Sequence, residues 1–178
     1  MFRKTGIVVC ALVLGLFVSL SASAADYQHS LDAEKMKFSW SVNSDQLAVK
    51  LSAPTTSWVA VGFNPSSKMK DADIVIGYVK KGKVTISDEF GIAATQHKSD
   101  SKVGGQDNVT VVGGSEEGNI TEIEFSIPLN SGDNKDTVID PNADTVVILS
   151  YGQGRDSFRV KHKFATTLTV NLSSGEVK

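Results

Sequence analysis

Cysteine is almost absent from this sequence, which has a single one, Cys10, among 178 residues. Cys10 lies in an apolar run near the N-terminus, inside a segment laid out like a secretory signal peptide. The chain from residue 26 onward therefore has no cysteine for a disulfide or for a thiolate metal site. An exported domain without disulfides must be held together by its hydrophobic core, or by that core together with a bound ligand.

Residues 1–25 indicate an exported protein. A basic start at residues 3–4 precedes an apolar run over residues 7–20, and small residues follow it. This order is typical of a signal peptide, with cleavage expected after Ala24 or Ala25. An uncleaved membrane anchor is the weaker alternative, because the run is shorter than the roughly 20 residues of a spanning helix. We expect a periplasmic or secreted mature chain with no inserted segment.

Blocks of basic residues are also absent. The formal net charge of the whole chain is −2 at pH 7, and no lysine- or arginine-rich run predicts a nucleic-acid partner or an anionic membrane surface. The remaining residues, 26–178, number about 150, which is the size of one domain with a sizeable core. The sequence therefore predicts a signal peptide over 1–25 and a single domain over 26–178.

Sustained helical stripes are missing, and strand-like alternation takes their place. The runs "QLAVKLSA", "NITEIEFSI" and "FATTLTVNL" place apolar residues at every second position, as in half-buried antiparallel strands. The runs "SWVAVGF", "ADIVIGYV" and "TVVILSYG" are apolar on both faces, as in strands that are covered on their second side. About nine short strands separated by turns predict an all-β sandwich or barrel. Residues 89–108 show no strand pattern, and we expect a long irregular loop there.

Catalytic templates are missing too. The sequence has no nucleophile elbow, no glycine-rich phosphate loop, and no histidine spacing typical of zinc. The segment 131–144, "SGDNKDTVIDPNAD", contains four aspartates but lacks the oxygen spacing and closing glutamate of a calcium loop, so it is interpreted as a polar turn. We therefore expect a domain without a catalytic site of its own.

One methionine stands out against this background. Met69 lies between Lys68 and Lys70 in a polar segment, whereas methionine usually fills gaps in cores. A thioether and an imidazole form an established axial pair for haem iron, which needs only one or two donor atoms and an apolar slot. His162 and His97 are the downstream imidazoles. The spacing alone also allows all three side chains to be ordinary core-edge or surface residues.

The order of several motifs adds to this. The run "TTSWVAVGFNPSSKMKDADIVIGYV" is followed by "VTISDEFG", then "GGSEEGNITEIEFSIPLNSGD", then "VVILSYGQGRDSFRVKH". This ordered set resembles the DOMON domain family, in which a Trp-x-Ala-x-Gly-Phe strand leads through a methionine-bearing loop to an Asp-x-hydrophobic-x-Gly strand. The resemblance extends over roughly Met36 to Leu172, which is nearly the whole predicted domain.

The resemblance implies a fold and a cofactor. DOMON domains are immunoglobulin-like antiparallel β-sandwiches outside the cytoplasm. Some, such as the cytochrome domain of cellobiose dehydrogenase, bind a b-type haem between a methionine and a histidine. Carried over by position, Met69 and His162 would be the axial ligands of one non-covalent haem b, with His97 ranked behind His162. No cysteine motif is available for covalent attachment.

Two functions follow as expectations. The first is an exported b-type cytochrome that passes electrons to or from a separate redox partner protein, with a membrane cytochrome and a flavoprotein as candidates. The second is a haem-free module that binds a sugar or small ligand on Trp40 or Trp58. For the haem, alternation suggests a set of apolar contacts: Trp58, Phe63, Ile74, Ile76, Tyr78, Phe90, Tyr151 and Phe158.

Overall fold

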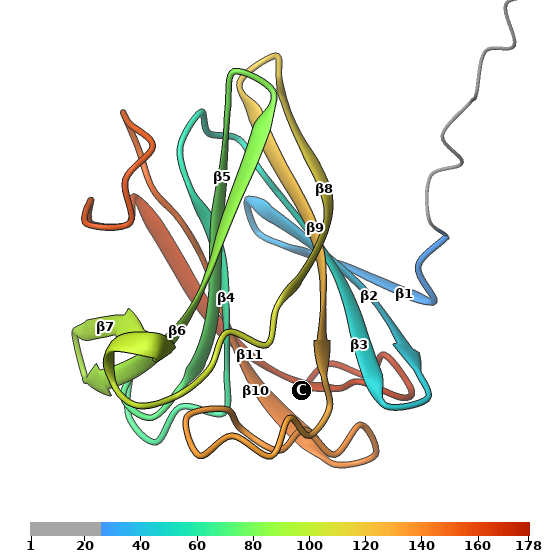
Figure 1. Ribbon diagram of the computed structural model, residues 1–178. Coiled ribbons are helices and arrows are strands. Elements are labelled where there is room, and N and C mark those ends of the chain that lie inside the picture. Colours follow the sequence, from blue (N-terminus) through green and yellow to red (C-terminus); the bar gives the residue numbers. More distant parts are fainter. Residues whose placement is uncertain (1–25) are drawn as a thin grey trace, which may run out of the picture.

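Eleven strands form two facing antiparallel sheets in the computed structural model, which describes residues 26–178 (Figure 1). The prediction of an all-β antiparallel sandwich is therefore confirmed. Residues 1–25, to which the signal peptide was assigned, lie outside the described residues. Within residues 26–178, no helix is both long enough and apolar enough to cross a membrane.

One sheet has five strands in the order β1-β2-β3-β9-β8. Their bounds are β1 His29–Ala33, β2 Met36–Asn43, β3 Gln46–Ala53, β8 Thr110–Glu117 and β9 Ile120–Pro128. In β3 and β9, buried side chains alternate with half-buried ones, as the two-residue period predicts. This sheet therefore buries one face in the core and leaves the other partly exposed to solvent.

The other sheet has six strands in the order β11-β10-β4-β5-β6-β7. Their bounds are β4 Val59–Phe63, β5 Asp73–Lys80, β6 Lys83–Ala93, β7 Gln96–Ser99, β10 Asp144–Tyr151 and β11 Phe164–Asn171. All five residues of β4 and the first five of β5 are buried. These central strands are therefore covered on both faces, as their uninterrupted apolar runs predict.

The main core lies between the two sheets. Its largest fully buried side chains include Trp40, Phe38, Phe63 and Phe125. The indole of Trp40 stacks on Phe38 and donates a 2.9 Å hydrogen bond to the carbonyl of Leu172. A second, smaller cluster of Trp58, Ala60 and Ile76 lies on the outer face of the six-stranded sheet. The domain thus has apolar surface on both sides of this sheet.

The irregular loop expected over residues 89–108 is partly wrong. The end of β6, the short strand β7 and a 3-10 turn at Asp100–Lys102 lie within residues 89–102, which are most of this segment. A register shift between Phe90 and Ala93 breaks the alternation of β6, and β7 is a four-residue edge strand with polar residues. Both features remove the two-residue apolar period that identifies a strand in sequence.

Candidate functional site

A cavity of about 690 Å³ opens on the outer face of the six-stranded sheet. Its floor is formed by outward-facing residues of four neighbouring strands: Ala60 and Gly62 of β4, Ile74 and Ile76 of β5, Ile148 and Ser150 of β10, and Ala165 and Thr167 of β11. Because many of these side chains are small, few of them project far from the sheet, and the floor suits a flat ligand. The volume lies within the roughly 300–1,000 Å³ of pockets that bury a small molecule.

Met69 reaches this cavity from the loop between β4 and β5. The loop is fixed by its own backbone: the amide of Ala72 donates to the Met69 carbonyl at 3.2 Å, and Asp71 donates to the Gly91 carbonyl at 2.7 Å. Lys68 and Asp71 both have positive φ, 54° and 59°, as expected of a tight turn. The thioether is therefore carried on a well-defined loop, half-buried at the edge of the cavity.

His162 reaches the same cavity from the segment between β10 and β11. This segment is held to the two residues just before β4. The Ser57 hydroxyl donates to the Arg155 carbonyl at 2.7 Å, and the indole of Trp58 donates to the Val160 carbonyl at 3.2 Å. Because β4 and β10 are antiparallel, with Val59 opposite Tyr151, this segment and the Met69 loop lie at opposite ends of β4. Met69 and His162 therefore approach one floor from its two ends.

His97 of β7 also lines the cavity. Its Nδ1 makes a close contact with the Glu89 carboxylate of β6, which orients the ring and leaves Nε2 as the nitrogen available to a ligand. The third histidine, His29, belongs to the other sheet, where it stacks on Trp40 at 5.3 Å between ring centroids. The three predicted site residues therefore share one cavity, and His29 has no part in it.

Cationic side chains stand around the cavity. Lys68, Arg159 and Lys161 line it, and they are exposed on the two loops that carry Met69 and His162. Lys70, the other neighbour of Met69, points to Asp71 instead, with 3.9 Å between Nζ and Oδ2. The cavity thus combines an apolar floor with a positive rim, which suits a flat apolar ligand with carboxylates at its edge.

The predicted apolar contacts are only partly right. Trp58, Ile74, Ile76 and Phe158 line the cavity, and Tyr78 packs on Phe158 with ring centroids 5.1 Å apart. The other three belong elsewhere: Phe63 and Tyr151 lie in the core between the sheets, and Phe90 packs under Lys135. Successive residues of a strand face opposite sides, and Phe63 is an odd number of positions from Trp58. Alternation could have excluded it.

Neither tryptophan forms an open platform for a sugar. Trp40 is 1% exposed in the core between the sheets, and Trp58 is 4% exposed beneath the segment that carries His162. Gly152 packs so closely on the Trp58 indole that a Cβ there would overlap the ring. Trp58 therefore supports the wall of the cavity from beneath the His162 segment.

Comparison with known families agrees with this architecture. Residues 32–152 match the DOMON domain family, and the chain belongs to that family. The resemblance inferred from the ordered motifs is thus confirmed.

Known relatives and solved structures extend the comparison. DBH-like monooxygenase protein 1 of Homo sapiens is 33% identical over 133 residues, which cover 72% of this chain and 21% of the relative. The Mus musculus protein of the same name is 33% identical over 132 residues, covering 70% and 21%. The chain therefore spans about a fifth of the length of these curated relatives.

Two cytochrome domains share the fold. The cytochrome b domain of pyranose dehydrogenase from Coprinopsis cinerea superposes with a TM-score of 0.61 at 14% identity, covering 79% of this chain and 78% of that one. The cytochrome domain of Myriococcum thermophilum cellobiose dehydrogenase gives 0.57 at 9% identity, covering 79% of each chain. At such identities the likeness establishes a shared fold.

Proposed function

We propose that this protein is an exported b-type cytochrome that binds one non-covalent haem through Met69 and His162. It would act in the periplasm or outside the cell, passing electrons to or from a separate redox partner protein, and would have no catalytic site of its own. The observation that carries the proposal is the convergence of both side chains on one cavity with a flat apolar floor. The shared fold with two cytochrome domains supports it.

The residues around the cavity fit a haem in three respects. A thioether and an imidazole are suitable axial donors for iron. The small side chains of Ala60 and Gly62 leave room over the floor, while Trp58 and Phe158 provide apolar walls. The rim cations can pair with propionate carboxylates. A haem bound there would supply a one-electron iron couple.

The proposed roles of the protein groups follow from this set. Met69 and His162 would hold the haem iron through a thioether and an imidazole. The neutral thioether favours reduced iron and raises the potential. Lys68, Arg159 and Lys161 would hold the ligand edge at the wet side of the cavity, where a partner protein can approach.

Haemin titration of the purified protein tests the proposal. We expect saturation at one haemin per chain and a six-coordinate low-spin spectrum, with sharp α and β bands after dithionite reduction. Pyridine extraction should release the cofactor, because no cysteine outside the first 25 residues can hold it covalently. A protein that gives no saturable difference spectrum would contradict the proposal. Binding of a glycan in a screen of that protein would then favour the ligand-binding alternative.

The Trp58–Val160 hydrogen bond gives a second expected result. Trp58→Phe keeps an aromatic wall but removes the indole donor that binds Val160, two residues before His162. A hydrogen bond of this kind contributes roughly 0.5–1.5 kcal/mol. We therefore expect the haemin dissociation constant to rise about 2- to 10-fold. The measurement is the same haemin titration.

Tyr78→Phe is the matched control, because it also removes one polar atom beside Phe158 but leaves the Val160 bond intact. We expect wild-type haemin affinity from this variant. If both variants lost haemin affinity equally, the loss would come from the lower polarity near the wall and not from the missing Trp58–Val160 hydrogen bond.

A further inference from the structure

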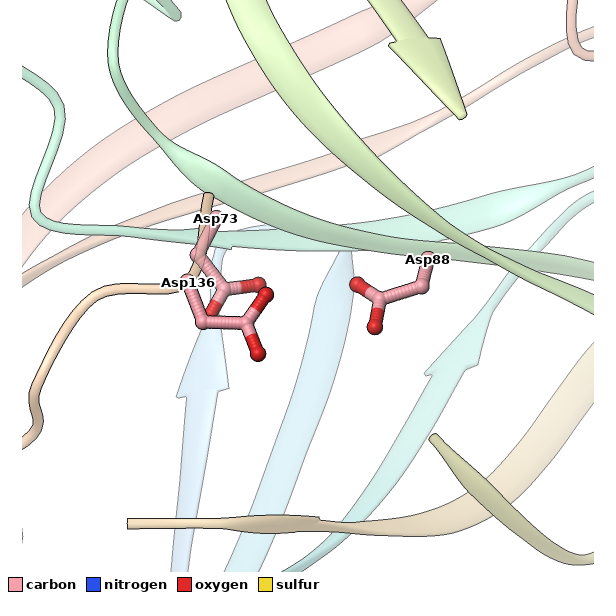
Figure 2. Close-up of side chains that lie close together, drawn as sticks. All are labelled: Asp73, Asp88 and Asp136. Atoms are coloured by element: carbon pink, nitrogen blue, oxygen red, sulfur yellow. The ribbon is translucent and has the colours of Figure 1, made fainter. Parts of the chain in front are cut away.

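Three aspartates converge at one end of the sandwich, on the face of the six-stranded sheet opposite the cavity. They come from separate segments: Asp73 begins β5, Asp88 lies on β6, and Asp136 belongs to the connection between β9 and β10 (Figure 2). One carboxylate oxygen of each lies within 4.8 Å of the others. Asp73 and Asp88 are 5% and 4% exposed, so this is a buried anionic centre.

A fourth aspartate points to a missing partner. Asp100 of the 3-10 turn is 1% exposed, and neither of its carboxylate oxygens has a hydrogen-bond partner. Burial, followed by the charges of the nearby Asp88 and Asp136 carboxylates, raises its pKa to about 7. Burying a carboxylate without a partner destabilises the folded state, because burial removes its hydrating water and no hydrogen bond or cation replaces that water. Asp136 Oδ1 is also buried and without a partner.

The remaining hydrogen bonds position the carboxylates without neutralising them. The backbone amide of Asn108 donates to Asp88 Oδ2 at 2.9 Å, and the Asn108 side-chain amide donates to Asp136 Oδ2 at 2.8 Å. The backbone of Thr137 donates to Asp73. Each of these three aspartates therefore has an oxygen left for another ligand.

Residues 26–178 place no ion pair on any of the four aspartates. The side-chain carbons of Lys135 pass beside Asp100, because both lie within 3.0 Å of the position of a Cβ on Gly105, but the Lys135 ammonium lies over the ring of Phe90 at 5.0 Å from its centroid. Burial and mutual repulsion raise the pKa of Asp73 well above its usual range and that of Asp88 to about 7. Independently of these shifts, the convergence of three carboxylates and the partnerless oxygens of Asp100 and Asp136 leave a site that a cation would fill.

We propose that this cluster is a structural calcium site, with Asp73, Asp88 and Asp136 as ligands and Asp100 facing them as the fourth carboxylate. The donor set consists of oxygens alone, which selects hard cations over zinc or copper. Ca²⁺ accepts six to eight oxygen ligands in a flexible geometry, whereas Mg²⁺ keeps several of its waters and is usually held by only one or two carboxylates. A centre in which several carboxylates converge therefore favours calcium.

The proposed ion would join parts of the fold that are far apart in sequence. Its ligands belong to β5, β6, the 3-10 turn and the β9–β10 connection, which runs across the lower end of the sandwich in Figure 1. Gly105 lies against this point, where an added Cβ would be 3.0 Å from Asp100 Oδ2. The site would thus fasten two long connections to the six-stranded sheet, in a domain without a disulfide.

Thermal unfolding with and without calcium tests the site. The purified protein is first treated with EGTA, and unfolding is then followed by circular dichroism at pH 7.5 in EGTA, in CaCl₂ or in MgCl₂. At a calcium concentration about 100 times the dissociation constant, we expect the midpoint to rise by roughly 5–10 °C. Magnesium should produce a smaller shift. Calorimetric titration with CaCl₂ should give one site per chain.

The Asp100→Asn variant distinguishes an ion-binding site from a cluster of carboxyl groups that share protons and bind no ion. In EGTA, the variant should melt at or above the wild-type temperature, because the amide relieves repulsion. In CaCl₂, it should melt below wild type, because one carboxylate is lost. Asp140→Asn, in the same β9–β10 connection but exposed, should keep the full calcium response. If Asp100→Asn fails to fold, calorimetric titration of the wild-type protein still decides the question.

The inference would be overturned by equal wild-type midpoints in EGTA and CaCl₂ with no heat of binding. An equal response to magnesium would contradict the assignment to calcium. All of these measurements are made without haemin, so their failure leaves the haem proposal intact, and a protein that does not bind haemin can still bind calcium.

Discussion

His162→Ala should abolish the low-spin spectrum of the haemin complex, whereas His97→Ala should leave it in place. Both imidazoles line the cavity, but His97 lies on β7, next to the end of β6 that is hydrogen-bonded to the Met69 loop. His162 reaches the floor from the opposite end of β4, where it can face Met69. Loss of an axial imidazole should cost at least the roughly 10- to 100-fold in affinity that loss of a supporting residue costs at a metal site. The measurement is haemin titration with absorption spectra of both oxidation states.

Met69→Ala completes this experiment. It removes the neutral sulfur donor, so the complex should lose its sixth ligand and its potential should fall. His29→Ala is the control, because that imidazole stacks on Trp40 in the other sheet. A low-spin spectrum that survives His162→Ala and disappears in His97→Ala would identify His97 as the ligand, contrary to our assignment.

Gly91→Ala should destabilise the protein and displace Met69 at the same time. A Cβ on Gly91 would overlap the carbonyl oxygen of Met69 and lie 3.1 Å from the Ala72 amide nitrogen. Both are backbone atoms in a hydrogen-bonded turn, so no side-chain rotation can relieve the overlap. Overpacking of this kind costs about 1–3 kcal/mol. We expect the unfolding midpoint to fall by roughly 5 °C or more, and the haemin complex to lose its thioether signature.

Gly113→Ala is the matched control for this variant. Gly113 has no atom within 4 Å of an added Cβ, and its φ lies outside the positive range. Its midpoint should therefore stay within about 2 °C of wild type, because the substitution fits without strain. A Gly91→Ala protein with a wild-type midpoint would mean that the Met69 loop can move freely.

Local patterning predicted much of the fold because one face of most strands is buried. The two-residue period in "QLAVKLSA" and "NITEIEFSI" corresponds to β3 and β9, and the double-sided apolar runs correspond to β4 and β5. The pattern did not predict the edge strand β7, because an edge strand need not have an apolar face. Patterning thus detects burial, and it misses backbone pairing where burial is weak.

The two sites differ in how much the sequence could predict. Met69 was noticeable because it is chemically out of place between two lysines, and the ordered motifs related it to His162. The acidic cluster had no such signal, because Asp73, Asp88 and Asp136 lie on different segments and meet only through the packing of the sheet. The aspartates of residues 131–144 were interpreted as a polar turn, and one of them proves to belong to a buried centre.

The pairing of β4 with β10 also determines at which stage of folding the cavity can form. Asn64, which follows β4, accepts a hydrogen bond from the Val146 amide, 82 residues later. Closing so long a loop makes this pairing a late event in folding. A nascent chain that ends before β10 would leave the apolar edge of β4 open, which favours aggregation. Ligand uptake must therefore follow completion of almost the entire chain, whatever the ligand is.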